Sequence, residues 1–173
     1  GKTAQAKATQ QGFRNAWARA DVELETFNLD PAAFEAAITP ATRAVVVVHL
    51  FGLAAKMHEI LAIAGRHGLA VIEDAACAVG TTYRDLPVGG LGDAGCFSFH
   101  PRNVITTAEG GMITTRRADL ADVIRSVRNH GSTGPAPGVD ANRPYAMSTF
   151  DVLGHNLRLS DIQAAVGIAQ MAK

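Results

Sequence analysis

The chain has 173 residues, of which 47% are hydrophobic and 18% charged, so it is long enough for one globular core and too short for two full domains. Sixteen basic residues balance sixteen acidic ones without a basic run, which argues against a nucleic-acid-binding surface. The longest apolar run, Ala44 to Val48, is far shorter than the roughly 20 residues that a membrane span needs, and the polar N-terminus does not resemble a signal peptide.

The first half of the chain predicts a strand, a helix and a second strand. Asp30 and Pro31 are typical of a helix start, and the short helix is expected to end at 39–40. The β-branched segment 44–50 predicts a buried strand, and the apolar spacing from Met57 onward predicts a helix. The segment AVIED (70–74) follows as another strand. A strand–helix–strand unit of this length implies parallel strands, so we expect an α/β fold with a mainly parallel sheet.

The second half predicts two further strands and two helices. The strands are expected at 95–99 and 111–115, and a helix at 120–127. Residues 131–144 are turn formers without periodicity and predict a long exposed loop. Ser160 and Gln163 form a capping-box pattern that opens a last helix. The apolar face of that helix is expected to contain Ile162, Ala165, Val166 and Ala169.

Two adjacent carboxylates, Glu73 and Asp74, stand where a parallel strand ends, which is where open α/β sheets bind ligands. Successive strand residues point to opposite faces, so only one of the two needs to face a site. Both acids are compatible with a simple strand-end turn. One of them is equally compatible with a carboxylate that keeps a cofactor's ring nitrogen protonated.

Other patterns in the chain give weaker evidence for a functional site. The glycine-rich segment 89–95 matches G-x-G-x-x-G but runs into a strand instead of opening a helix, so a dinucleotide site is rejected. Ser98 and His100 point the same way on one strand, which does not aim the imidazole at the hydroxyl. No histidine or cysteine spacing indicates a metal site. The cysteines, Cys77 and Cys96, predict buried free thiols in a reducing cytoplasm.

Taken together, four segments resemble the DegT/DnrJ/StrS-type sugar aminotransferases of the fold-type I pyridoxal-phosphate (PLP) enzymes. The resemblance runs from about residue 20 to the end, and residues 1–20 remain unassigned. It implies that 21–173 form part of the three-layer PLP-binding large domain, with the family's N-terminal segment and C-terminal small domain absent from this chain. The matching segments are 25–52, 67–83, 88–115 and 150–170.

The resemblance also implies roles for individual residues. Asp74 matches the aspartate that pairs with the pyridine nitrogen of PLP, and Ser98 matches a hydroxyl that binds its phosphate. Cys77 stands where the family usually has glutamine or histidine near the phenolic oxygen of the cofactor. Asn156 matches an asparagine that reaches the phosphate of the neighbouring subunit's cofactor, which implies a homodimer with composite sites.

Asn103 is the departure from the family pattern that matters most. It stands five residues after Ser98, where the family has the lysine that forms a Schiff base with PLP. An amide nitrogen is delocalised into its carbonyl, so it cannot act as that amine or shuttle a proton. Arg102 cannot replace it because a guanidinium stays protonated. No lysine lies between Lys56 and Lys173.

The function implied is PLP-dependent amino transfer from an amino-acid donor to a nucleotide-linked keto-sugar. Two alternatives remain open because of Asn103. Some members of the superfamily replace the lysine with histidine and act as keto-sugar dehydratases, which asparagine does not match, although His100 is near. The other alternative is a catalytically inactive or regulatory relative.

Overall fold

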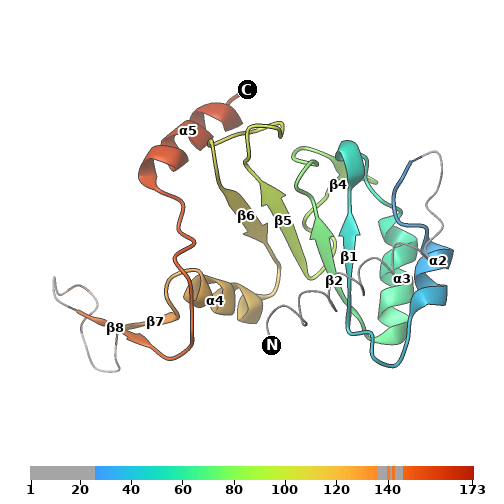
Figure 1. Cartoon of the computed structure of the whole chain (residues 1–173), viewed down its shortest axis with the longest axis horizontal. Helices are drawn as coiled ribbons and strands as arrows, with labels where there is room; N and C mark the ends of the chain where they lie inside the picture. Colours follow the sequence, from blue (N-terminus) through green and yellow to red (C-terminus); the bar gives the residue numbers. More distant parts are fainter. Residues whose placement is uncertain (1–25, 136–139, 141, 143–145) are drawn as a thin grey trace, which may run out of the picture.

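The computed structural model describes residues 26–135, 140, 142 and 146–173. The unassigned segment 1–20 therefore lies outside the described residues. The centre of the fold is a four-stranded sheet in the order β1-β2-β5-β6 (Figure 1). The helices and strands are α2 (Pro31–Ala37), β1 (Ala44–Val48), the 3-10 turn η1 (Leu50–Gly52), α3 (Met57–His67), β2 (Ala70–Asp74), β3 (Thr82–Tyr83), β4 (Leu86–Pro87), β5 (Ala94–Ser98), β6 (Gly111–Thr114), α4 (Ala118–Val127), β7 (Ser132–Pro135), β8 (Ser148–Phe150) and α5 (Asp161–Met171).

The strand–helix–strand unit predicted for the first half is confirmed. The side chain of Asp30 caps α2 by accepting a hydrogen bond from the Ala33 N–H at 2.7 Å. Gly68 ends α3 in the left-handed conformation, with φ of 63°. β1 and β2 pair in parallel, and β5 joins β2 in parallel. β6 is antiparallel to β5, so the sheet is mainly parallel with one antiparallel edge strand.

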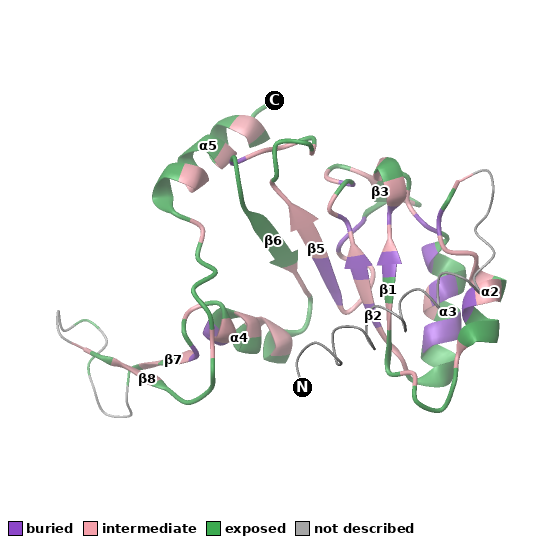
Figure 2. Cartoon of the chain, viewed as in Figure 1, coloured by how far each residue is buried: buried purple, intermediate pink, exposed green. Residues whose placement is uncertain are grey.

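The core lies between α3 and the β1–β2 half of the sheet, where Figure 2 shows the buried residues concentrated. Met57 and Ile60 of α3 are fully buried against Val47 and Val71 of the strands, and Phe34 of α2 completes the cluster. Burying each such side chain contributes about 1.5–3 kcal/mol. This packed core therefore supports β2 up to its carboxyl end.

One expectation for the second half is wrong. The segment 131–144 does not begin as a loop, because β7 pairs antiparallel with β8 and makes a hairpin. The last helix forms where it was expected, as α5, and its apolar face is exposed among the described residues, with Ile162 80% exposed. Amphipathic spacing predicted the helix correctly, but spacing cannot say what covers its face.

No helix among the described residues is long and apolar enough to cross a membrane.

Glu73 is a fully buried carboxylate that ties three parts of the fold together. One oxygen, Oε1, accepts hydrogen bonds from the backbone N–H groups of Leu91 and Gly92, both at 2.7 Å. The other, Oε2, accepts from the Gly89 N–H at 2.7 Å and lies 3.0 Å from Nε2 of His49. The glycine-rich turn therefore wraps a carboxylate of its own chain instead of a nucleotide phosphate.

The tautomer of His49 follows from its other nitrogen. The Ala55 N–H donates to Nδ1 at 3.2 Å, so the ring proton is on Nε2, from which it is donated to Glu73. Burial is the strongest influence on Glu73 and raises the pKa of its carboxyl. The hydrogen bonds from His49 and the turn together outweigh burial, so the net pKa lies below its ordinary value. The carboxylate form is consequently the one that the fold stabilises.

We expect Glu73→Gln to lower the free energy of unfolding by about 3 kcal/mol near neutral pH. The NH₂ group of the glutamine side chain would face two hydrogen-bond donors, and the buried N–H groups there would lose their acceptor. Because the folded-state pKa is depressed, the stabilisation by Glu73 is complete above the ordinary carboxyl pKa near 4.5 and is lost as pH falls below it. Urea unfolding at pH 7 and pH 4 should show the difference between wild type and variant shrinking in acid.

The matched control is Glu35→Gln, which removes an exposed carboxylate paired with Arg66 and His67 at the surface. Its effect should be much smaller. Equal losses for the two variants would show that the buried carboxylate has no special role.

The β5–β6 connection contains a non-glycine residue in the left-handed region, Ala108, with φ of 68°. A Cβ in this region is unfavourable. We expect Ala108→Gly to raise the free energy of unfolding by about 0.5–1 kcal/mol, after allowing for the greater freedom of glycine in the unfolded chain. The control, Ala165→Gly within the exposed part of α5, should change stability in the opposite direction. A loss of stability at both positions would contradict this expectation.

Candidate functional site

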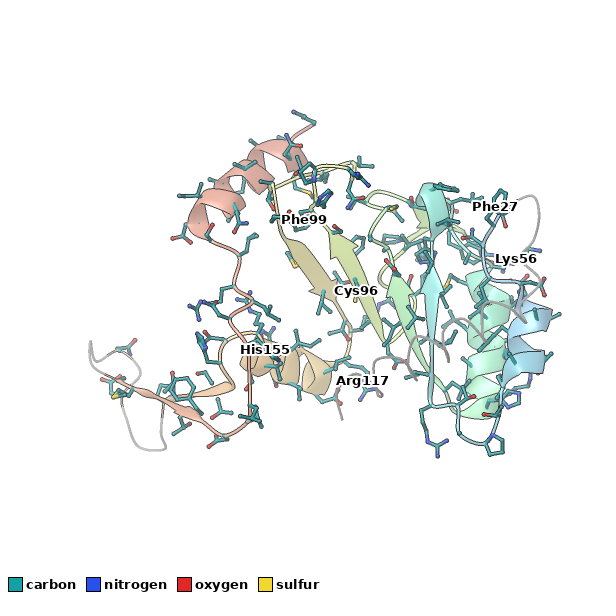
Figure 3. The ribbon with its side chains drawn as sticks, viewed as in Figure 1. Phe27, Lys56, Cys96, Phe99, Arg117 and His155 are labelled. Carbon is teal, nitrogen blue, oxygen red and sulfur yellow. The ribbon has the colours of Figure 1, made fainter. Side chains whose placement is uncertain are left out.

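The candidate site lies at the carboxyl ends of the parallel strands β2 and β5. Asp74 is paired in register with Cys96, and Ser98 lies two residues further along β5. Because strand side chains alternate, these three side chains lie on one face of the sheet and Glu73 lies on the other. The register therefore places the two adjacent carboxylates on opposite faces of the sheet, as expected from their positions in the strand. Figure 3 labels Cys96 within the sheet.

Asp74 is held at the end of its strand by both backbone and side chain. Its carbonyl accepts from the His49 N–H at 3.0 Å, and its Oδ1 accepts from the Ala76 N–H at 3.1 Å. The second carboxylate oxygen makes no hydrogen bond to another described residue and is available to a ligand. Asp74 as a residue is half-buried.

Cys96 is the site neighbour that the motifs did not single out. Burial and, after it, the charge of Asp74 raise the pKa of the Cys96 thiol, so it stays protonated beside the carboxylate. The sequence signal that could have identified Cys96 is its position two residues before Ser98, because residues two apart on a strand share a face. A neutral thiol leaves Asp74 as the charged group at this position of the sheet.

Ser98 ends β5 with its hydroxyl oriented by the following turn. The His100 N–H donates to Ser98 Oγ at 3.3 Å, which leaves the hydroxyl proton free to be donated elsewhere. The strand pattern predicted for Ser98 and His100 extends too far, because β5 ends at Ser98 and His100 lies in the turn. His100 instead accepts from the Arg102 N–H through Nδ1 at 3.2 Å.

Asn103 lies between the end of β5 and the turn that follows β2. Its Nδ2 donates to the Ser98 carbonyl at 3.2 Å, and its Oδ1 accepts from the Cys77 thiol at 3.6 Å. The structure therefore brings Asn103, Ser98 and Cys77 together, with Asp74 three residues before Cys77. Both ends of the Asn103 amide are occupied by protein groups, so this residue links the two loops at the site.

Asn156 is not part of this cluster within its own chain. Its backbone forms an isolated bridge with Asn129, which follows α4. Its neighbour His155 lies beside α4, at the opposite end of β6 from Phe99 (Figure 3). The Asn156 side chain is exposed. Of the five residues expected at the cofactor, four gather at one edge and the fifth lies elsewhere.

Curated relatives match most of this chain, and the chain spans less than half of their length. GDP-perosamine synthase from Caulobacter vibrioides is 49% identical over 153 residues, which cover 88% of this chain and 38% of that protein.

Solved structures agree on the fold. The aminotransferase from Psychrobacter cryohalolentis superposes with a TM-score of 0.82 at 35% identity, over 88% of this chain and 39% of the other. GDP-4-keto-6-deoxymannose-3-dehydratase (ColD), as an H188N mutant with bound GDP-perosamine, gives a TM-score of 0.79 at 30% identity, over 89% and 42%. The expected fold class, an α/β PLP-dependent transferase domain of fold type I with a mainly parallel sheet, is confirmed by these neighbours together with the observed sheet order.

The family model agrees with both comparisons and extends them toward the N-terminus. The model of the DegT/DnrJ/EryC1/StrS aminotransferase family matches residues 5–173, which begins earlier than the resemblance seen in the motifs near residue 20. The chain belongs to the DegT/DnrJ/EryC1/StrS aminotransferase family.

Proposed function

We propose that this chain is the cofactor-binding part of a PLP-dependent aminotransferase that acts on a nucleotide-linked keto-sugar, with Asn103 at the position of the lysine that would bind the cofactor covalently. The observation that carries the proposal is the gathering of Asp74, Ser98, Cys77 and Asn103 at the carboxyl edge of β2 and β5. The names of the relatives, with a GDP-linked sugar in each of two, support the substrate class.

The donor set fits PLP at Asp74 and Ser98 and fits it poorly at Cys77 and Asn103. The free carboxylate oxygen of Asp74 suits a protonated pyridine nitrogen, and the free Ser98 hydroxyl proton suits a phosphate oxygen. The Cys77 thiol donates to Asn103 and is at most a weak contact for a phenolic oxygen. Asn103 has no amine to offer. The residues therefore fit a cofactor bound without a covalent link.

Each residue has a limited task in the proposed reaction. When bound, PLP supplies an electron sink that allows an amino group to move between donor and acceptor carbons. Asp74 holds the proton on the ring nitrogen, which maintains that property. Ser98 orients the phosphate end. Asn103 cannot accept or return a proton, and general acid–base assistance is worth roughly 10²–10⁴ in rate. Amine transfer by the chain with Asn103 is accordingly slow.

A dehydratase that lacks the lysine is the second candidate. The observation that favours it is residue 103 itself, because ordinary amino transfer needs an amine there. Against it, Nδ1 of His100 already accepts from the Arg102 N–H and His100 belongs to the turn after β5. Assays of amine transfer and of water elimination on the same keto-sugar nucleotide separate the two enzymes. PLP binding with neither activity would favour an inactive or regulatory relative.

A homodimer and a cytoplasmic location complete the proposal. Asn156 is exposed and its backbone pairs with Asn129, which follows α4, and an exposed position suits a residue that reaches a partner's phosphate. Large apolar side chains are exposed around it, including Leu153 at 99% and Leu157 at 66%. The expectation that both thiols are buried is wrong, because Cys77 is exposed and Cys96 is half-buried, but two free thiols still suit a reducing compartment.

We expect no covalent attachment of PLP near the site in the protein as its sequence stands. Borohydride reduction of the PLP-treated protein followed by peptide mass mapping should find no phosphopyridoxyl group in residues 95–110, because no lysine lies between Lys56 and Lys173. Lys56 and Lys173 serve as internal reporters of nonspecific labelling. A modified peptide within 95–110 would show that another group provides the link.

We expect Asn103→Lys, made in the protein that carries this chain, to bind PLP covalently and to transfer an amino group to a keto-sugar nucleotide. The gain in rate should be at least about 10²-fold, since both an amine and a proton carrier are restored. Absorption spectra of the bound cofactor and coupled assays with several amino-acid donors measure the two effects.

The matched control is Arg102→Lys, which adds an amine one position away on the exposed side of the turn. It should give neither the covalent spectrum nor activity. An Asn103→Lys protein that binds PLP covalently but transfers no amine from any donor would leave the aminotransferase proposal without support.

A further inference from the structure

The loop that carries Asn103 is in contact with α5, a helix more than fifty positions further along the chain. The two lie side by side at one end of β5 and β6 (Figure 1). A Cβ added at Gly167 of α5 would meet the Thr107 methyl group at 3.1 Å, and one added at Gly110 would meet Leu159 at 2.9 Å. Helix and loop are therefore in close contact over several residues.

Gln163 makes the polar link in this contact and uses both ends of its amide. Its Oε1 accepts from the Ser160 N–H at 3.0 Å, which is the capping-box bond that starts α5. Its Nε2 donates to the carbonyl of Glu109 in the loop at 2.8 Å. The cap needs only an acceptor, which glutamate supplies equally well. The bond to Glu109 needs a donor, which glutamate lacks.

Hydrogen bonds inside the loop extend this link toward the site. The Thr107 hydroxyl donates to the Glu109 carbonyl at 2.8 Å, and the Thr107 N–H donates to the Phe99 carbonyl at 3.0 Å. Asn103 is held by its N–H to the His100 carbonyl at 2.9 Å. The amide of Asn103 then meets the Cys77 thiol. These hydrogen bonds, together with the chain segment from Phe99 to His100, connect Gln163 to residue 103.

We propose that Gln163 is a positioning residue of the site: its side-chain amide fixes the β5–β6 loop to α5 and so holds residue 103 against Cys77. The inference rests on the proposed function only in placing residue 103 at the cofactor. The position of the loop itself can be tested without any cofactor, because Cys77 reports on its contact with Asn103.

The test compares Gln163→Glu with wild type by the rate of alkylation of Cys77 with iodoacetamide, measured by peptide mass mapping. Glutamate keeps the cap of α5 and places a carboxylate oxygen against the Glu109 carbonyl, so the loop should move away. Release of the Cys77 thiol from Asn103 Oδ1 should speed alkylation about two- to tenfold, the range that one hydrogen bond accounts for. Cys96, whose thiol pKa is raised, provides an internal reference in the same digest.

The matched control is Gln170→Glu, the same change on the same helix at a side chain that makes no hydrogen bond to another described residue. It should leave Cys77 alkylation unchanged. An unchanged Cys77 rate in Gln163→Glu, or an equal change in Gln170→Glu, would overturn the proposal. A parallel rise at Cys96 would also overturn it, because Gln163 would then hold the whole fold and not this loop. A protein that binds no PLP would contradict the proposed function and leave this result unaffected.

Discussion

A buried carboxylate, Glu73, is the constraint on which the geometry of the site depends. The cost of burying its charge is offset by three backbone N–H groups and one imidazole, all aimed at the two oxygens. These donors come from the turn before β5 and from the residue that follows β1. Side chains alternate along a strand, so holding the Glu73 side chain on one face of β2 places the next side chain on the opposite face. Asp74 is consequently directed to the other face, with Cys96 and Ser98.

The site is therefore an outcome of sheet geometry more than of any single loop. Parallel pairing of β2 with β5 brings two strand ends to one edge, and the register sets Asp74 beside Cys96. The antiparallel return through β6 allows a short connection, and that connection carries Asn103. At position 103 the asparagine amide bridges the Ser98 carbonyl and the Cys77 thiol.

The two halves of the described chain differ in how they are stabilised. The α2–α3–β1–β2 half has a closed apolar core, whereas α5 and the β7–β8 hairpin present large apolar side chains to the outside. Polar links such as the one from Gln163 to Glu109 consequently matter more in the second half, where apolar burial is small. The loop that carries Asn103 lies between the halves and takes contacts from both.

The sequence by itself determined the local elements and the family. Asp30 with Pro31, Gly68, and the pair Ser160 and Gln163 marked helix ends correctly because capping depends on neighbours within a few residues. The strand–helix–strand unit predicted parallel strands because a crossover of this length joins strands that run in the same direction. The expectation that the first of these strands is buried is wrong, because Val46 of β1 is 47% exposed and only Val47 is fully buried. The motifs that surround Asp74, Ser98 and Asn103 identified the family, and the absence of an amine at 103 followed from the letters alone.

Only the tertiary structure decided which groups meet. The glycine-rich turn 89–95 could be excluded as a nucleotide site from sequence, yet its actual partner, Glu73, lies sixteen or more positions away and could not be inferred from spacing. The strand character of Ser132–Pro135 was hidden because pairing with β8, and not residue preference, makes it a strand. The exposure of Ile162 and the second role of Gln163 depend likewise on contacts between distant segments. Local rules specify where an element begins and which face is apolar, whereas long-range pairing specifies what that face and each polar side chain will touch.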